Sequence, residues 1–545
     1  MNEKTKTALK ILQASVLLGI LWDILVKDSL SGLNIFVWFT LLAAAMIAIV
    51  WRKDPEKITS QTLLLHAAVI FFAFTFTIRD SAELKALSIL AILSILAVQT
   101  VSALRLRTEI SGVVHYFVGA IWTGLNAAFG SFALITADIE WNFLKKTGIS
   151  KHLISVIKGI AIAVPLLFVF GGLFAAADAV FEGLVDDVFQ LNPALVGHVI
   201  VIGVISWFTA GYLRASMIGI DNFAKEPSPN KDSISINPET GGDAAETEEA
   251  GPEALAEKKS FDLQNLDNSY LPEMFRLGTV EIAVVLGLIN MLFLVFVIIQ
   301  IPYLFGGMQL IQTTPDFKLA EYARRGFGEL IAVAALVLPI LLGTHWLLRR
   351  EEPAAEKLFR TLAAVQIGLL FVIMISAAQR LLLLSGNLGY GLTAGRLYPI
   401  AFIVFLAMIF IWFGATVLRG MRGRFAWGAL WCGLFVLATL HVLNPDDFIV
   451  RTNLRLMEQG RPFDAEYNAG LSSDAVPALL GSANLMNSQN GERVMKRLYL
   501  RHCILSKKED IRSWNWSRKR AQTILGISPA FTANKCAEGS SRSGQ

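Results

Sequence analysis

The chain has 545 residues, of which 54% are hydrophobic and only 17% are charged, and its formal net charge is +4. A soluble domain carries about 25% charged residues, so this chain lacks the charge to cover the surface of a soluble protein of its length. The composition excludes a soluble multidomain enzyme, a fibrous protein and a disordered chain. The small positive excess does not by itself indicate nucleic-acid binding. A polytopic membrane protein remains.

Apolar runs of about 18 residues or more, long enough to cross a bilayer as helices, recur along the chain. They show no strand-like alternation, so we predict helices. The clearest runs are Ser29–Trp51, Ala86–Leu104, Gly159–Ala177, Ala194–Leu213, Ile282–Ile301, Leu330–Leu348, Thr361–Gln379, Leu397–Leu418 and Phe425–Leu443, and the weaker ones are Ala8–Val26, Gln61–Ile78 and Val113–Ala137. The N-terminal run Ala8–Val26 follows several lysines, as a signal peptide would, but no small-x-small cleavage site comes after it. We therefore expect a retained helix and not a signal peptide. The predicted fold class is all-α, a polytopic transmembrane bundle of about 11–12 spans.

The distribution of Lys and Arg between loops predicts the topology. If Val113–Ala137 does not cross, one side of the membrane holds most of the basic residues, and the other holds only Lys27, Arg79, Lys85, Lys318, Arg324, Arg325 and Arg396. This favours eleven crossings, with the N-terminus inside, the C-terminus outside and Val113–Ala137 as a re-entrant or interfacial piece. Ala120, Gly124 and Ala128 would form its small-residue packing face, and Gly130 offers a break. Twelve crossings remain the alternative.

Two segments are predicted to lie outside the lipid. Asp221–Phe275 has thirteen acidic residues and four lysines and is expected to be a disordered linker. A helical tail begins at Asn444, where an Asn cap precedes Pro and two acids, and a second short helix opens at Ser472. The predicted regions are 1–214 (membrane), 215–276 (linker), 277–443 (membrane), 444–530 (helical tail) and 531–545 (disordered end).

Charges inside membrane spans are costly and therefore mark candidate functional residues. Asp23 and Arg380 lie near the outer ends of their spans, and Lys158 and Glu281 about one turn from the inner side. Pairing Asp23 with Arg380 and Lys158 with Glu281 would neutralise all four, and the alternative is that each reaches the nearest headgroups. Polar side chains nearer mid-span, Asn126, Asn290 and Gln366, are expected to form interhelical hydrogen bonds.

No nucleotide-binding, hydrolase or metal motif is found in the sequence, and the histidines His66, His198, His345 and His441 lie on separate spans. We therefore expect no cofactor, no metal and no catalytic residue. Of the three cysteines, Cys503 and Cys536 could form a disulfide only on an oxidising side of the membrane.

Two basic segments are candidates for binding anions. Arg324 and Arg325 stand in a predicted outer loop, where lipid headgroups, a carboxylate such as Glu329 or a bound anion would hold them, and the acids of residues 178–187 face the same side. The tail stretch Arg493–Arg520 has ten basic and two acidic residues, with Trp514 and Trp516. Contact with anionic lipid or an ordinary solvated helix face explains this stretch better than nucleic acid does.

Six strings, in the order FVFGGLFAAADAVFEGL, EYARRGFGEL, YGLTAGRLYPI, LNPDDFIVRTNL, RPFDAEYNAGLSSDAVPALL and RSWNWSRKRA, resemble a bacterial family of membrane proteins catalogued as domain of unknown function 4173, related to the group numbered 4153. The resemblance implies a multi-span inner-membrane protein with a helical C-terminal part and brings no established activity. It implies that the shared pattern includes Tyr322, Arg324, Gly326, Phe327, Tyr390, Arg396, Tyr398, Asn444 and Asp446.

The expected function is a non-catalytic role in the bacterial envelope, as a scaffold, sensor or regulator. The expected partners are the lipid bilayer, anionic lipid at the basic tail and a protein partner. One alternative is a secondary transporter with Arg380, Glu281 and Asn290 near its path, although no internal repeat supports it. Another is a membrane enzyme acting on a lipid or glycan through Arg324 and Arg325.

Overall fold

A computed structural model describes residues 2–26, 32–53, 55–101, 108–140, 159, 193–218, 276–305, 327–349, 352–385, 391–506 and 510–528. These ranges are almost entirely helical and contain no strand. Eleven of their helices are long and apolar enough to cross a membrane. The predicted all-α, polytopic fold is therefore confirmed. The run Gly159–Ala177, apart from residue 159, and nearly all of the acidic linker lie outside the described residues.

The N-terminal half is a group of antiparallel helices around one apolar core. Its long helices are α1 (Glu3–Val26), α2 (Leu33–Lys53), α3 (Ser60–Ile78), α4 (Ala82–Val101), α5 (Val113–Ala133) and α9 (Pro193–Met217), with short turns η1 (Pro55–Lys57), η3 (Thr108–Ile110) and η4 (Leu134–Asp138). Helices α1 and α9 run in opposite directions, because Asp23 near the end of α1 contacts His198 near the start of α9. Their other ends, with Lys4 and Arg214, share Asp138; we name this the far end of the bundle.

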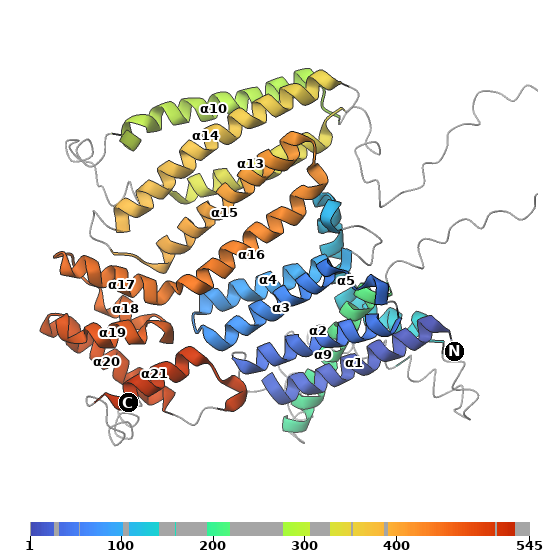
Figure 1. Ribbon diagram of the computed structural model, residues 1–545, viewed down its shortest axis with the longest axis horizontal. Helices are drawn as coiled ribbons and strands as arrows, with labels where there is room; N and C mark the ends of the chain where they lie inside the picture. The colour runs from blue at the N-terminus through green and yellow to red at the C-terminus, as the bar shows by residue number, and fades with distance from the viewer. Residues whose placement is uncertain are drawn as a thin grey trace, which may run out of the picture.

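The C-terminal half has its own apolar core. It consists of α10 (Thr279–Phe305), α13 (Phe327–Leu347), α14 (Pro353–Ser385), α15 (Ala394–Thr416) and α16 (Phe425–Leu443), with η8 (Val417–Arg419) and η9 (Arg422–Arg424) between the last two. Figure 1 shows the long helices side by side, from α10 and α14 at one edge through α15, α16, α4 and α3 to α2 and α1 at the other. The two halves thus meet where α16 packs beside α4.

Helix α5 lies across the far ends of its neighbours, with both of its ends there (Figure 1). On the side before α5, Thr108 hydrogen-bonds Gln61 in the first turn of α3 at 3.5 Å. On the side after α5, Asp138 contacts Lys4 in the first turn of α1 at 2.8 Å. The first turns of α1 and α3 are at the same end of the bundle, since α2 runs back between them.

The chain bends after α5. Arg214 donates to both Asn126 at 2.8 Å and Asp138 at 2.6 Å. A straight helix would hold these two residues about 18 Å apart, too far for one guanidinium to reach both. The π-helical turn Leu134–Asp138 provides the bend, and the helix continues through Gly130, where the sequence suggested a break.

The expected packing face of α5 is wrong. Gly124 is exposed, and an added Cβ there would meet nothing within 4 Å. The close contact with α9 is instead made one turn away, where Gly130 faces Gly211 and a Cβ on Gly211 would lie 2.1 Å from the Asn126 carbonyl oxygen. The small-residue spacing correctly predicts that another helix approaches α5 closely. Several glycines and alanines of α5 share that spacing, so it does not predict which of them make the contact.

The tail domain packs on the end of the bundle opposite the far end (Figure 1), which we name the tail end. It comprises α17 (Pro445–Glu458), α18 (Ala465–Gly470), η10 (Ser473–Ala475), α19 (Val476–Ser482), η11 (Ala483–Leu485), α20 (Ser488–Leu505), η12 (Ile511–Ser513) and α21 (Trp516–Ile527). A separate apolar core holds it together, with Val450, Val476, Leu479, Val494 and Leu525 fully buried.

The predicted helix starts in the tail are found, with one difference. Ser472 accepts a hydrogen bond from the Asp474 main chain at 3.3 Å, as a cap should. Helix α17 begins at Pro445, but the Asn444 side chain forms no cap. Asn444 instead adopts a left-handed conformation with φ of 55°, which Asn tolerates, and ends α16 there. One residue thereby turns the chain from the bundle into the tail.

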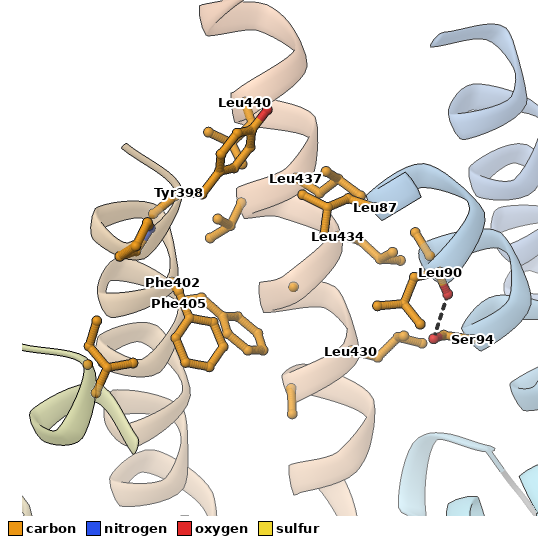
Figure 2. A pocket seen from close by; sticks show the side chains of 18 residues that line it. Leu87, Leu90, Ser94, Tyr398, Phe402, Phe405, Leu430, Leu434, Leu437 and Leu440 are labelled. Atoms are coloured by element: carbon orange, nitrogen blue, oxygen red, sulfur yellow. Dashed lines mark hydrogen bonds between the residues drawn. The ribbon is translucent and has the colours of Figure 1, made fainter. Parts of the chain in front are cut away.

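A cavity of about 690 Å³ lies where the two halves meet, between α4, α15 and α16 (Figure 2). Its walls are mostly apolar, and its large side chains include Leu87, Leu90, Phe402, Phe405 and Leu437. Gly328 and Ile331 of α13 also line it. The cavity therefore lies beside the contact between α4 and α16.

Candidate functional site

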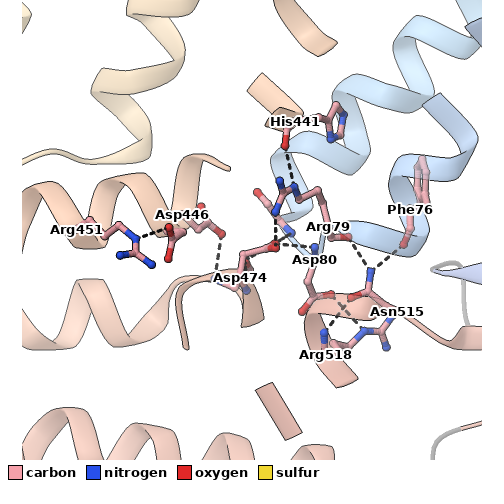
Figure 3. A network of polar contacts seen from close by, with 12 residues as sticks. Phe76, Arg79, Asp80, His441, Asp446, Arg451, Asp474, Asn515 and Arg518 are labelled. Carbon is pink, nitrogen blue, oxygen red and sulfur yellow. Dashed lines mark hydrogen bonds and ion pairs between the residues drawn. The ribbon is translucent and has the colours of Figure 1, made fainter. Parts of the chain in front are cut away.

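The tail domain closes over the turn between α3 and α4. The main-chain N–H groups of Asp80 and Ser81 precede α4 and have no partner within that helix. Both donate to one carboxylate oxygen of Asp474 in the tail domain, at 2.8 and 3.2 Å (Figure 3). Asp474 thus caps a membrane helix that lies 393 residues away in the chain. We name the contacts of residues 79–81 with Asp474, Asn515 and Arg518 the tail joint.

Arg79 ties the tail joint to α16. Its Nε donates to the main-chain oxygen of His441 at 2.8 Å, and its guanidinium lies 3.6 Å from Asp474. The His441 ring in turn contacts the Ser88 hydroxyl of α4 at 2.8 Å. The C-terminal turn of α16 and the beginning of α4 are therefore fixed together at the tail end.

Asn515 links two further helix ends. Its Nδ2 donates to the carbonyl oxygens of Phe76 and Arg79 at 2.8 and 2.9 Å, and its Oδ1 accepts from the Arg518 main chain at 3.0 Å (Figure 3). The side chain satisfies carbonyl groups at the end of α3 and also caps α21. Asn515 is fully buried, so each of these bonds replaces contacts with water.

Asp80 is the second carboxylate of the tail joint. It lies 2.9 Å from Lys85 and 3.3 Å from Arg518. Burial opposes its ionisation, but Lys85, a hydrogen bond from Ser473 and Arg518 outweigh burial and hold the pKa of Asp80 below its ordinary value. The charged form of Asp80 therefore stabilises the docked tail.

The tail domain holds the C-terminal half through a different set of bonds. Asn453 accepts from the Leu392 N–H at 2.6 Å and donates to the Leu392 carbonyl at 2.9 Å, ahead of α15. The Tyr467 hydroxyl accepts from the Ala394 N–H at 2.7 Å, and burial raises the pKa of Tyr467. Gly391, with φ of 69°, leaves room for the Asn453 amide. One small domain is therefore bonded to both membrane halves.

A third carboxylate, Asp446, lies between these two sets of contacts. It accepts from the Ser472 main chain at 3.1 Å. Burial raises the pKa of Asp446 above its ordinary value, and Asp474 and Glu83 add to the rise while Ser472 opposes it. Docking therefore makes ionisation of the Asp446 side chain less favourable than it is in water.

The structure places the predicted intramembrane charges differently from the sequence analysis. Asp23 contacts His198 on α9 at 2.5 Å. The pair of Asp23 with Arg380 is wrong, because α1 and α14 stand on opposite sides of the helix array (Figure 1). Glu281 accepts from the Gly278 N–H at 3.1 Å at the start of α10, where its charge suits the helix dipole. Its expected partner Lys158 lies outside the described residues.

The remaining candidates divide into two groups. Tyr398, Arg396, Asn444 and Asp446 surround the tail end, where the Arg396 guanidinium binds the Gly391 carbonyl. Outside the described residues lie Tyr322, Arg324, Arg325, Gly326 and Tyr390, the acids of residues 178–187 and the Phe327 side chain. No group of three or more metal-binding side chains occurs in the part of the chain that the structure describes.

The sequence analysis missed a buried charge cluster at the far end. The Asp138 carboxylate is fully buried and lies 2.6 Å from Arg214 and 2.8 Å from Lys4. Asp138 stands one residue beyond the weakest predicted span, so counting charges inside spans did not select it. Two of the mid-span amides do bond between helices: Asn126 to Arg214, and Asn290 to the Leu362 carbonyl at 3.1 Å.

The residues of the tail joint were also missed as a site, although the sequence carried a signal for them. Asp474, Asn515 and Arg518 stand in two of the six strings, and Asn453 and Leu392 stand in two others. Those strings meet at the tail end, so they describe one structural joint. Their order along the chain showed that they belong together but not that they touch.

Comparison with known protein families finds a match. Residues 66–481 match the family described as domain of unknown function 4153. The strings had pointed to the related family 4173, which this comparison does not show. No curated protein and no solved structure matches the chain. Since the match spans more than half of its length, the chain belongs to the family described as domain of unknown function 4153.

Proposed function

We propose that this integral membrane protein is a non-catalytic scaffold or regulator of the bacterial inner membrane, whose tail domain is locked to both membrane halves and presents a surface to a partner. One observation carries the proposal. The buried polar side chains of the tail domain, Asp474, Asn515 and Asn453, are each bonded to main-chain groups at helix ends. An enzyme site instead aims free polar groups at a cavity.

The proposed orientation has the N-terminus and acidic linker in the cytoplasm and the tail domain outside, with eleven crossings and α5 in the interface at the far end. Both ends of α5 approach the same helix ends, which supports a segment that does not cross. Cys503 of the tail is disulfide-bonded, as suits an oxidising compartment. In intact cells, a membrane-impermeant maleimide should label Cys503 only after external reduction. Labelling that requires cell lysis would contradict this orientation.

The basic tail is proposed to touch anionic lipid headgroups. The position of its segment 512–520 supports this proposal, because the Trp514 carbonyl accepts from the Leu33 N–H at the start of the long apolar helix α2 at 3.0 Å. Lys519 and Arg520 are exposed beside it, and about 1 kcal/mol per basic residue is typical for such contacts. A partner protein would approach from the remaining tail surface.

A deletion strain complemented with variants tests the scaffold role, with survival under detergent stress as the readout. Asp474→Ala should fail to complement, because it releases the tail from the α3–α4 turn. Glu281→Gln and Arg380→Ala should complement. The opposite pattern, with intramembrane charges required and the tail joint dispensable, would replace the scaffold by a transporter.

One observation favours transport as a second candidate. The Gln366 side chain is almost fully buried in α14, and neither its oxygen nor its nitrogen has a hydrogen-bond partner among the described residues; the same holds for the Asn290 oxygen. Unsatisfied amides within the bundle are available to a polar solute. If they bind one, Gln366→Leu abolishes its uptake into vesicles. If they do not, Gln366→Leu raises the melting temperature, because it removes two unsatisfied groups.

A further inference from the structure

The cavity between the two membrane halves has the chemistry of a hydrocarbon site. Among its lining residues, the polar side chains are Ser94 and Tyr398. The Ser94 hydroxyl donates to the Leu90 carbonyl of its own helix at 2.8 Å. Water requires two to four polar partners to occupy a buried space, and the walls do not supply them. The volume, about 690 Å³, lies within the range of about 300–1,000 Å³ of ligand sites.

The cavity follows most of the length of α16. Along that helix it extends from Ala429 to Leu440, which is about 16 Å at 1.5 Å per residue. Helix α16 spans Phe425–Leu443, so the cavity begins about one turn from the tail end and extends past the middle of the helix. An acyl chain spans about half of the hydrocarbon core of a bilayer, which is about 30 Å thick, and therefore fits this length.

The cavity opens sideways on the surface of the spanning helices. Leu90 is 61% exposed and Phe402 39% exposed on its rim, and both stand within helices that cross the membrane. The medium at that surface is lipid hydrocarbon. An empty apolar space forfeits the dispersion contacts of its lining, so a chain entering from the adjacent leaflet would recover them.

Charged side chains of both signs surround the rim at the tail end. The Tyr398 hydroxyl points there (Figure 2), near Ser81, Asp446, Glu83 and Asp474. The cations Arg79, Lys85 and Arg518 pair with Asp474 and Asp80, and Arg501 interacts with Asp80 and Asp446. The rim is therefore polar, as suits the headgroup end of a lipid.

We propose that the cavity binds one acyl chain of a phospholipid whose headgroup lies at the polar rim on the tail side. The lipid fills the space between α4 and α15 alongside α16, which protein side chains leave open. This site is independent of the scaffold role, since it needs neither a partner nor a complementation phenotype.

Photocrosslinking of the full-length protein in nanodiscs tests the acyl site. The probe is a phosphatidylethanolamine with a diazirine on one acyl chain. Peptides 398–405 and 429–440 should be labelled saturably. Ala401→Phe, which fills the cavity, should lower that labelling about tenfold, equivalent to about 1.4 kcal/mol. Val404→Phe is the matched control, because Val404 is on the same helix, is 49% exposed and does not line the cavity; its labelling should equal that of the wild type.

Melting temperatures distinguish loss of lipid binding from misfolding of the Ala401→Phe variant. Adding the ethanolamine lipid to delipidated protein should raise the melting temperature of the wild type and of Val404→Phe, but not that of a folded Ala401→Phe variant. Labelling that is unsaturable and equal in all three proteins would overturn the acyl site.

Discussion

Replacing Asp474 by alanine should release the tail domain from the α3–α4 turn without unfolding it. The carboxylate accepts two main-chain N–H groups at 2.8 and 3.2 Å and lies 3.6 Å from Arg79. Its side chain is 1% exposed and that of Arg79 20%. Removing one partner of a buried pair costs about 3–5 kcal/mol. Asp474→Asn keeps the shape and loses the charge, which for two hydrogen bonds amounts to about 2 kcal/mol.

Hydrogen exchange of the full-length protein in nanodiscs measures this loss. A cost of about 3 kcal/mol raises the undocked population roughly 100-fold, so the amides of Asp80, Ser81 and the first turn of α21 should exchange faster by up to that factor. Leu498, in the core of the tail domain, should stay protected, which distinguishes undocking from unfolding.

Asp447→Ala is the matched control for Asp474→Ala. Asp447 forms an ion pair with exposed Arg451 at 2.6 Å within α17, and such helix pairs contribute about 0.3–0.5 kcal/mol. Its effect on exchange should stay below about threefold. If Asp474→Ala leaves Ser81 exchange within that limit, or if Asp447→Ala accelerates it as strongly, the capping argument is wrong.

Three further predictions concern other contacts. Burial raises the pKa of Asp446, so docking is most stable when Asp446 is protonated and loses stability as pH rises through that pKa. Asp446→Asn should therefore dock more stably than the wild type at neutral pH. Exchange rates measured over a pH series should show this advantage vanish on acidification. Gly32→Ala should expose the α1–α2 turn to protease, since φ is 106° and a Cβ would lie 2.4 Å from the Trp514 oxygen, whereas Gly481→Ala, with open space around it, should not. Asp138→Asn should cost about 3–5 kcal/mol and lower the melting temperature, because it leaves buried Arg214 without its anion; Glu3→Gln, in an exposed pair with Lys6, should change little.

The helical class and the starts of the tail helices could be predicted because they depend on local features. Apolar runs have a length that only a bilayer explains, and Pro445 and Ser472 act within one turn of their own helices. The pairing of Asp23 with Arg380 failed because hydropathy gives the depth of a charge in the membrane but not which helix stands beside it. His198 was visible as an isolated histidine, yet nothing in the spacing placed it opposite Asp23.

The tail joint could not be derived from spacing at all. Asp474 and Ser81 are 393 residues apart. In a sequence, a carboxylate that caps a distant helix cannot be distinguished from one that caps the helix in which it stands. Asp474 stands in the first turn of a short helix capped by Ser472. An acidic residue at that position already has a local explanation, so the sequence provides no reason to expect its contact with the α3–α4 turn. A useful sign is the density of Asn and Asp in the tail strings, since short polar side chains readily bind main-chain groups, and Asn515 does so both in its own helix and at the end of α3.

The tail domain and the proposed lipid site act on the same contact between the membrane halves, and this couples them. The tail is bonded to the α3–α4 turn through Asp474 and to the segment before α15 through Asn453, while the cavity is lined by α4, α15 and α16. An acyl chain that holds these helices at their docked spacing favours docking, and docking favours the chain. The coupling is reciprocal: the factor by which delipidation raises exchange at Ser81 must equal the factor by which undocking weakens binding of the lipid. If Asp474→Ala undocks the tail and leaves lipid affinity unchanged, the cavity and the tail joint are independent, and the tail does not set the spacing of the two halves.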